Sequence, residues 1–209
     1  MGATSGKRVL VTGSLGQIGS ELALALRDRY GEQNVVASDV RSDEERVLSG
    51  KGPFVALDVL DANAFDAVVA DNRIDTIYHL AAILSAVAEQ DPLRAWKINI
   101  DGLCNALESA RRHGCSLFVP SSIGAFGPTT PLDATPQETI MRPTSMYGVT
   151  KVSGELLCDY YHGRFGVDTR GVRYPGIISN VTMPGGGTTD YACLLYTSPS
   201  PRDRTRSRM

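Results

Sequence analysis

The sequence predicts an α/β domain built on a doubly wound parallel sheet, with helices on both faces of the sheet. Three observations support this prediction. Strand-like and helix-like segments alternate, a glycine-rich turn joins the first pair, and small or polar residues follow the strands. The 209 residues include 42% hydrophobic residues and carry a formal net charge of −2. This hydrophobic content is ordinary for a globular domain. The small net charge creates no electrostatic field that would attract nucleic acid or an anionic membrane.

Short runs rich in β-branched residues mark the expected strands. They cover residues 8–12, 35–38, 54–57, 76–80, 117–119 and 169–173. Apolar residues at helical spacing predict helices over residues 17–30, 61–70 and 147–165. Asp91 followed by Pro92 opens a further helix that ends at Gly114. The apolar stripe expected on this helix comprises Leu93, Trp96, Ile100, Leu103 and Leu107.

The glycine-rich turn lies between the first strand and the first helix. Gly13, Gly16 and Gly19 permit a tight turn and let backbone N–H groups approach a pyrophosphate at the positive end of the helix. Taken alone, the spacing also fits a plain glycine turn. Asp39 follows Gly19 by 20 residues at the end of the second strand, where a carboxylate accepts hydrogen bonds from ribose hydroxyls and repels a 2′-phosphate. The pair predicts NAD as the cofactor, with Arg41 as the one residue nearby that favours NADP.

Two further strand ends carry candidate cofactor residues. Asp58 and Val59 follow the third strand, where Asp58 is placed either to hydrogen-bond the adenine or to cap a helix. After the fourth strand, Leu80, Ala81 and Ala82 offer small side chains against which a cofactor can lie. No second His or Cys accompanies His79 at metal-ligand spacing, so we expect no metal site.

Tyr147 and Lys151 are the candidate catalytic pair. Positions i and i+4 share one face of a helix, so the Lys151 ammonium can lie near the Tyr147 phenol and favour the phenolate. Ser122 ends the fifth strand, and its hydroxyl can hold a substrate oxygen while the tyrosine takes the proton. A Y-x-x-x-K motif is common by chance, but here it follows the glycine turn, Asp39 and the serine in the expected order.

These motifs together resemble the extended short-chain dehydrogenase/reductase family. The TGxxGxxG turn spans residues 12–19, the strand-ending serine precedes an aromatic-Gly pair, and YxxxK spans residues 147–151. Finer similarity points to the L-threonine 3-dehydrogenase branch; it lies in residues 79–85, 120–123, 127–131, 173–178 and 184–191. The resemblance implies a Rossmann-type fold and NAD-dependent oxidation of the L-threonine 3-hydroxyl to 2-amino-3-oxobutanoate.

The resemblance also implies roles for individual residues. Ser122 and Tyr147 would act on the substrate hydroxyl, while Lys151 would lower the pKa of the tyrosine and bind the nicotinamide ribose. Ser85, Ser121, Thr189 and Asp190 would surround the amino acid. Cofactor contacts are expected from Gln17, Ile18, Asn99, Tyr174 and Ile177, although a solvent-facing Asn99 is an equal alternative. We also expect a homodimer through the helices 92–113 and 147–165.

The expected organisation has three parts. Residues 1–174 form the NAD-binding Rossmann domain with the catalytic residues, and residues 175–192 begin the substrate-binding portion. Residues 193–209 are rich in Ser, Pro and Arg with no apolar period, so we expect a non-native tail and a mostly missing C-terminal substrate lobe. Four widely spaced cysteines and the lack of a signal peptide or membrane-length apolar run predict a cytoplasmic protein.

Two other functions remain open from the sequence. A nucleotide-sugar epimerase or dehydratase shares the same cofactor half, although no basic cluster after Tyr174 offers a site for its diphosphate. The chain could also be an inactive cofactor-binding fragment, because its substrate portion is incomplete.

Overall fold

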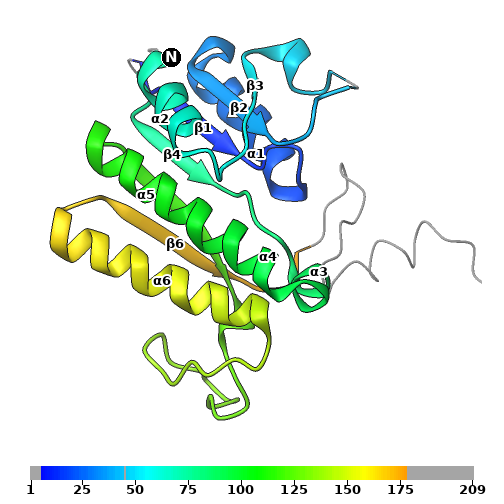
Figure 1. Ribbon diagram of the computed structural model, residues 1–209, viewed down its shortest axis with the longest axis vertical. Coiled ribbons are helices and arrows are strands. Elements are labelled where there is room, and N and C mark those ends of the chain that lie inside the picture. The colour runs from blue at the N-terminus through cyan, green and yellow to red at the C-terminus, as the bar shows by residue number, and fades with distance from the viewer. Residues whose placement is uncertain (1–5, 45, 178–209) are drawn as a thin grey trace, which may run out of the picture.

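The computed structural model describes residues 6–44 and 46–177 (Figure 1). A single parallel sheet organises this part of the chain, with the strand order β3-β2-β1-β4-β5-β6. The order reverses between β1 and β4, which is where dinucleotides bind in folds of this kind. The predicted doubly wound α/β fold is therefore confirmed. The strands are β1 (Val9–Thr12), β2 (Val35–Asp39), β3 (Phe54–Ala56), β4 (Thr76–His79), β5 (Ser116–Ser122) and β6 (Thr169–Tyr174).

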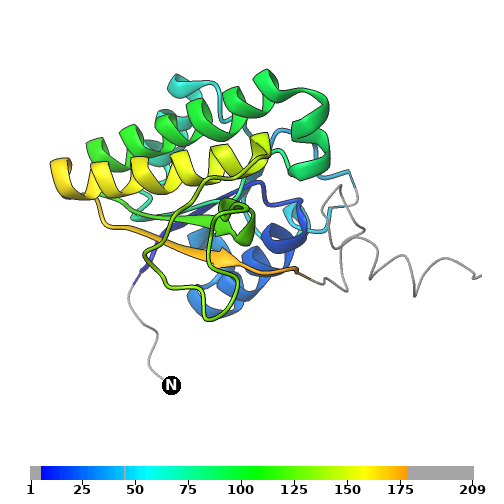
Figure 2. The ribbon, with the colours of Figure 1, turned by 90° about the horizontal axis from the view of Figure 1, so that it is seen from below.

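Helices cover both faces of the sheet. The helices are α1 (Gln17–Tyr30), α2 (Ala62–Asp71), α3 (Ser85–Gln90), α4 (Pro92–Trp96), α5 (Gly102–His113) and α6 (Met146–Phe165). Short 3₁₀ turns occur at η1 (Glu32–Asn34), η2 (Ser49–Lys51) and η4 (Ile123–Ala125). Figure 2 shows α1 on one face of the sheet, and α2, α5 and α6 side by side on the other.

The core forms two clusters, one on each face of the sheet. Strand β1 contributes to both, because Leu10 packs under α2 and α5 while Val9 and Val11 pack against α1. Phe65 and Leu107 fill the first cluster and are completely buried. A strand buried on both faces reads as a continuous apolar run rather than an alternating one, as residues 9–11 do.

The helix expected between Asp91 and Gly114 is divided. A π-helical turn, η3 (Lys97–Asp101), separates α4 from α5. The wider turn shifts the apolar stripe to another face, since each residue beyond it is displaced relative to an uninterrupted helix. Leu93 is 81% exposed and Trp96 is 39% exposed, so the predicted stripe was wrong at these two positions. Its remaining members, Ile100, Leu103 and Leu107, are buried.

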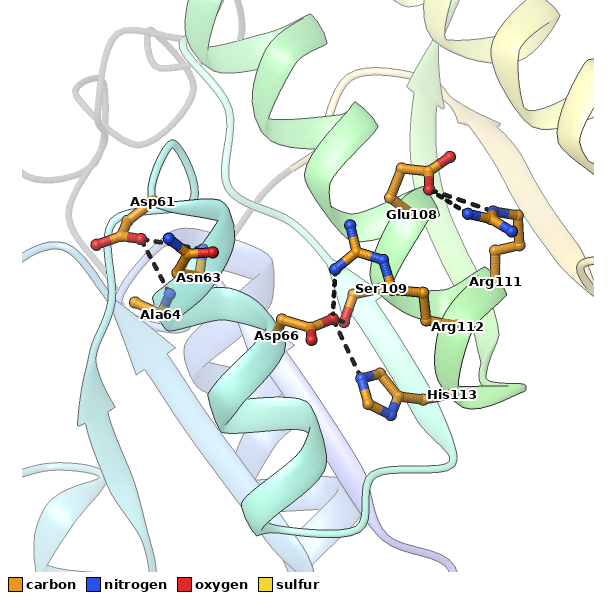
Figure 3. A network of polar contacts seen from close by, with 9 residues as sticks. All are labelled: Asp61, Asn63, Ala64, Asp66, Glu108, Ser109, Arg111, Arg112 and His113. Atoms are coloured by element: carbon orange, nitrogen blue, oxygen red, sulfur yellow. Dashed lines mark hydrogen bonds and ion pairs between the residues drawn. The ribbon is translucent and has the colours of Figure 1, made fainter.

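A polar network joins α2 to α5 (Figure 3). The Asp66 carboxylate accepts hydrogen bonds from Ser109 Oγ at 3.0 Å and pairs with Arg112 and His113. Burial would raise the pKa of Asp66, but the hydrogen bonds from Ser109 and His113 hold it below its ordinary value. Asp61 caps the N-terminus of α2 by accepting from two backbone N–H groups. The contacts of Asp66 hold α2 against α5 within the helix layer on one face of the sheet.

Candidate active site

The glycine turn is shaped by close backbone approaches. Gly13 has φ +64°, and a Cβ there would lie 2.7 Å from the backbone nitrogen of Ala81. A Cβ on Gly19 would lie 2.3 Å from the Gly13 carbonyl oxygen. Gly16 is less crowded and serves as the N-cap of α1, with no side chain capping the first turn. The turn therefore leaves uncapped N–H groups open to an anion such as a pyrophosphate.

Asp39 ends β2 and is almost fully paired. Its Oδ2 accepts from Leu15 N at 3.0 Å and from Arg41 Nη2 at 3.2 Å. Its Oδ1 accepts from Arg41 N at 3.1 Å and from Arg41 Nε at 3.0 Å. Burial would raise the pKa of Asp39, but these hydrogen bonds hold it below its ordinary value. A carboxylate has about four acceptor positions, so Arg41 occupies places that ribose hydroxyls would need.

The two residues after β3 play different parts. Asp58 is exposed, and its carboxylate accepts from Leu60 N at 2.9 Å within the turn that precedes α2. The helix cap itself is Asp61. Val59 is buried beneath α5, where its γ-methyl would lie 2.8 Å from a Cβ on Gly102. Asp58 thus remains accessible to a ligand, whereas the Val59 side chain belongs to the core.

Ser122, Tyr147 and Lys151 come together at the carboxyl end of β5. The Ser122 hydroxyl lies beside the Tyr147 side chain, next to Gly124. Lys151 Nζ lies 5.3 Å from the centre of the Tyr147 ring and donates to the Pro120 carbonyl oxygen at 2.8 Å. Burial raises the pKa of Tyr147, while the Ser122 hydroxyl acts in the opposite sense. Burial also lowers the pKa of Lys151 to about 8.

The approach of α6 to β5 depends on two glycines. A Cβ on Gly148 would lie 2.3 Å from the Gly124 carbonyl oxygen, and a Cβ on Gly124 would lie 3.3 Å from the Tyr147 ring. Ser145 begins α6 by capping Gly148 N. The first turn of α6 is therefore packed directly against the segment that follows Ser122, which sets the distance between the serine and the tyrosine.

Asn99 does not face solvent. It lies in the π-helical turn, where its Oδ1 accepts from Ile83 N at 2.7 Å. Its Nδ2 donates to Ile83 O and to Thr150 Oγ1, each at 3.1 Å. Thr150 in turn donates to the Tyr147 carbonyl oxygen. Asn99 thus connects the segment after β4 to the turn of α6 that carries the tyrosine.

The sequence did not single out Glu155, which lies at the same end of the sheet. Glu155 accepts from Ser121 Oγ and forms a two-pronged ion pair with Arg173, with N–O distances of 2.9 and 2.7 Å. Burial would raise the pKa of Glu155, but the hydrogen bond from Arg173 holds it below its ordinary value. Ser121, predicted near the substrate, is therefore bound to Glu155 in this structure. Glu155 follows Lys151 by one helical turn, a spacing that could have indicated it.

His79 is completely enclosed beside this cluster. Its Nδ1 lies 3.1 Å from Thr12 Oγ1, and its Nε2 has no hydrogen-bond partner within residues 6–44 and 46–177. Burial lowers the pKa of His79 to about 4, with the charge of Lys151 acting in the same direction. The ring is therefore neutral at physiological pH.

Two hollows are lined by several of the predicted ligand-binding residues. A cavity of about 580 Å³ is lined by residues that include Leu80, Ala81, Ala82, Asn99, Ser121 and Lys151. A second hollow of about 570 Å³ lies between α1 and the end of β6, with Gln17, Ile18, Tyr174 and Ile177 in its wall. Ser85 is the first residue of α3. Thr189, Asp190 and the tail 193–209 lie outside the described residues.

No helix within residues 6–177, position 45 aside, has the length and apolar character needed to cross a membrane. No group of three His, Cys, Asp or Glu side chains in the same part of the chain is arranged to hold a metal ion.

This fold and site define a class of protein. Residues 9–191 match the NAD dependent epimerase/dehydratase family, and the chain belongs to that family. An uncharacterized epimerase/dehydratase of Staphylococcus haemolyticus is 56% identical over 190 residues, which are 91% of this chain and 60% of the relative. The chain thus spans about 60% of the length of the curated relatives that it matches.

Solved structures give a more particular similarity. The L-threonine dehydrogenase of Clostridium difficile superposes with a TM-score of 0.89 and 58% identity, covering 93% of this chain and 61% of that one. A UDP-glucose 4-epimerase of Thermotoga maritima superposes with a TM-score of 0.73 and 28% identity, covering 80% and 55%. The resemblance expected from the motifs is confirmed, and the Clostridium difficile dehydrogenase is more similar to this chain than the Thermotoga maritima epimerase is.

Proposed function

We propose that this chain is the cofactor-binding and catalytic part of an NAD-dependent dehydrogenase that oxidises the 3-hydroxyl of L-threonine to 2-amino-3-oxobutanoate. The observation that carries the proposal is the meeting of Ser122, Tyr147 and Lys151 beside a glycine turn and Asp39. The substrate assignment is supported by the 58% identity to the Clostridium difficile L-threonine dehydrogenase.

Tyr147 is the proposed general base. A free phenol titrates near ~10, and burial raises the pKa of Tyr147, so the phenolate needs positive charge nearby. The Lys151 ammonium provides this charge, with Nζ 5.3 Å from the centre of the Tyr147 ring. Ser122, which lies beside Tyr147, orients the substrate oxygen. The hydroxyl proton passes to Tyr147 as the hydride leaves C3.

The residues at the edge of the sheet suit a dinucleotide. When bound, NAD supplies the hydride acceptor for the reaction. The backbone at Gly16 and the uncapped first turn of α1 would hold its pyrophosphate. Asp39 would bind the adenosine ribose, and Lys151 the nicotinamide ribose. The remaining cofactor contacts that we propose are Gly13, Gln17, Ile18, Gly19, Asp58, Val59, Leu80, Ala81, Ala82, Asn99, Tyr147, Tyr174 and Ile177.

A zwitterionic amino acid needs donors for its carboxylate and an acceptor for its ammonium. We assign Ser85, Thr189 and Asp190 to this task, with Asp190 as the acceptor. Ser121 would bind the amino acid only if its hydroxyl gave up its hydrogen bond to Glu155. The protein would be cytoplasmic, with residues 1–174 as the Rossmann domain, 175–192 as the start of the substrate portion and 193–209 as a non-native tail.

We also propose a homodimer through the outer faces of α4, α5 and α6. Figure 1 shows α5 and α6 side by side, so their outer faces form one continuous surface. Exposed apolar side chains lie on these helices: Leu93, Trp96, Leu156, Tyr160 and Phe165. Light scattering on the wild type and on Leu156→Arg tests this assignment, and a monomeric wild type would contradict it.

The catalytic assignment is tested by L-threonine-dependent NADH formation. The assay uses the 209-residue chain and a second protein in which residues 1–177 continue into the C-terminal part of the Clostridium difficile enzyme. Tyr147→Phe should abolish turnover while NADH affinity stays within a few-fold. Tyr160→Phe is the matched control, because Tyr160 is 56% exposed on the same helix.

Each outcome of this assay separates the alternatives. If Tyr147→Phe kept more than about a tenth of the rate, Tyr147 would not be the base. Turnover of UDP-glucose in place of L-threonine would favour a nucleotide-sugar epimerase or dehydratase. NADH binding without turnover in both proteins would identify a cofactor-binding fragment.

A further inference from the structure

Three successive turns of α6 hold the end of β5. Tyr147 contacts Ser122, Lys151 donates to the Pro120 carbonyl oxygen at 2.8 Å, and Glu155 accepts from Ser121 Oγ. Positions i, i+4 and i+8 lie along one helix face. Consecutive residues of β5 are therefore each fixed by one turn of the helix, and Glu155 is the only member of the series with no role in the proposed reaction.

Glu155 also reaches the neighbouring strand. Ser121 on β5 and Arg173 on β6 are partners in the strand register, and both bind the Glu155 carboxylate. Arg173 uses its third nitrogen to donate to the Gln137 carbonyl oxygen at 2.8 Å. The Arg173 and Glu155 side chains are only 15% and 20% exposed. One carboxylate thus joins two strand ends, a helix and the segment before α6.

Glu155 is the carboxylate that affects the charge of Lys151. The Lys151 ammonium donates to a neutral carbonyl, and burial lowers its pKa to about 8, whereas the charge of Glu155 acts to raise it. The titratable and charged groups in the same cavity wall are His79 from β4, Arg173 and Arg170 from β6, Glu138 from the segment before α6, and Cys158 and Asp159 from α6. His79 is neutral at physiological pH.

We propose that Glu155 is a positioning residue, which fixes the ends of β5 and β6 against α6 and balances the charges of Arg173 and Lys151 beside Tyr147. The proposal rests on the function given above, because Tyr147 and Lys151 matter for catalysis only if they act on a substrate. It predicts that removing the charge of Glu155 and removing the charge of Arg173 shift the pKa of Lys151 in opposite directions.

The test follows the titration of Lys151 in the chain without cofactor. The sequence has four lysines, so carbon-13 NMR of labelled lysine side chains resolves them, and Lys151→Met identifies the Lys151 signal. Glu155→Gln keeps an acceptor for Ser121 but removes the negative charge. The midpoint of the Lys151 titration, called the Lys151 midpoint below, should therefore fall by about one pH unit. Arg173→Gln removes the positive charge, so the midpoint should rise.

Controls separate this effect from a loss of structure. Asp168→Asn removes one negative charge from an exposed ion pair just before β6 and should leave the Lys151 midpoint unchanged. Glu155→Asp restores the charge and should bring the midpoint back toward the wild type. If the pair had a purely structural role, Glu155→Gln and Arg173→Gln would shift the Lys151 midpoint in the same direction. If Glu155→Gln failed to fold, the rise expected for Arg173→Gln would still decide the question, and an unchanged midpoint would overturn the proposal.

NADH affinity gives the second measurement. Fluorescence titration at a pH just below the wild-type Lys151 midpoint should show about threefold weaker binding for Glu155→Gln, since a smaller fraction of Lys151 carries charge. Asp168→Asn should bind like the wild type. If the wild type bound no NADH, the cofactor function would fail. Opposite shifts of the Lys151 midpoint would still support the role of Glu155.

Discussion

Two carboxylate–arginine pairs lie at the carboxyl edge of the sheet, and they differ in how they are built. Asp39 and Arg41 belong to one segment, two residues apart, and the Arg41 side chain is 62% exposed. Glu155 and Arg173 come from different elements and are both mostly buried. Water can replace an exposed guanidinium but cannot easily replace a buried one. The first pair is therefore suited to open for a ligand, and the second to hold elements in place.

Stability measurements should separate the two pairs most clearly. We expect Arg173→Ala to lower the free energy of unfolding by ~3 kcal/mol, because the mostly buried Glu155 would lose its two-pronged partner. Arg41→Ala should change it by less than ~0.5 kcal/mol, because Asp39 keeps its hydrogen bonds from the backbone N–H groups of Leu15 and position 41. Urea unfolding of both variants checks this difference, and equal losses would mean that burial does not distinguish the pairs.

The pH dependence of stability sharpens the description of the buried pair. The pKa of Glu155 lies below its ordinary value of 4.5, so the ionised carboxylate stabilises the fold above that pH. This contribution is lost as the pH falls through the lowered pKa. At pH 7, Glu155→Gln should be less stable than the wild type by ~1.5 kcal/mol. The gap should close on acidification, and a gap that stayed constant down to about pH 3 would contradict the assignment.

Cofactor choice tests the exposed pair. Asp39 at the end of β2 should favour NADH over NADPH by at least about tenfold, which corresponds to ~1.4 kcal/mol of repulsion against a 2′-phosphate. Fluorescence titration with the two reduced cofactors measures this preference. Equal affinities would show that Arg41 faces the ribose in place of Asp39.

The smallest expected effect concerns Arg41 itself. Because Arg41 occupies acceptor positions on Asp39, Arg41→Ala should tighten NADH binding about threefold, or ~0.6 kcal/mol, and weaken NADPH binding. Arg46→Ala is the matched control, an exposed arginine in the same segment. Weaker NADH binding by Arg41→Ala alone would show that Arg41 contributes to the site rather than competing for Asp39.

Local signals made much of the fold predictable. Helix α1 has the predicted bounds, Gln17–Tyr30, because glycines mark both of its ends. The doubly wound parallel sheet also follows the prediction. The short helix α3 (Ser85–Gln90) and the π-helical turn were not foreseen, since neither has a distinct period or cap in the sequence. Tertiary packing of Asn99 against Ile83 and Thr150 decides that turn.

The candidate site was predictable to a similar extent. The motif spacing anticipated that Ser122, Tyr147 and Lys151 would meet, and their roles stay predictions. The pairing of Glu155 with Arg173 depends on the register of β5 with β6, which no local pattern specifies. Likewise, the pairing of Arg41 with Asp39 depends on the conformation of the Arg41 side chain. Sequence patterns therefore indicated the candidate reacting groups better than the residues that hold them in place.

The contact between Gly148 and the Gly124 carbonyl has a consequence for recognising competent relatives. Any side chain at position 148 would place a carbon 2.3 Å from that oxygen and push the start of α6 away from β5. A chain could then keep its tyrosine and lysine in the familiar spacing and yet hold the phenol too far from the serine. Such a chain would match the motif as a pseudoenzyme. The contact at Gly148 therefore adds a steric requirement that the Y-x-x-x-K motif does not state.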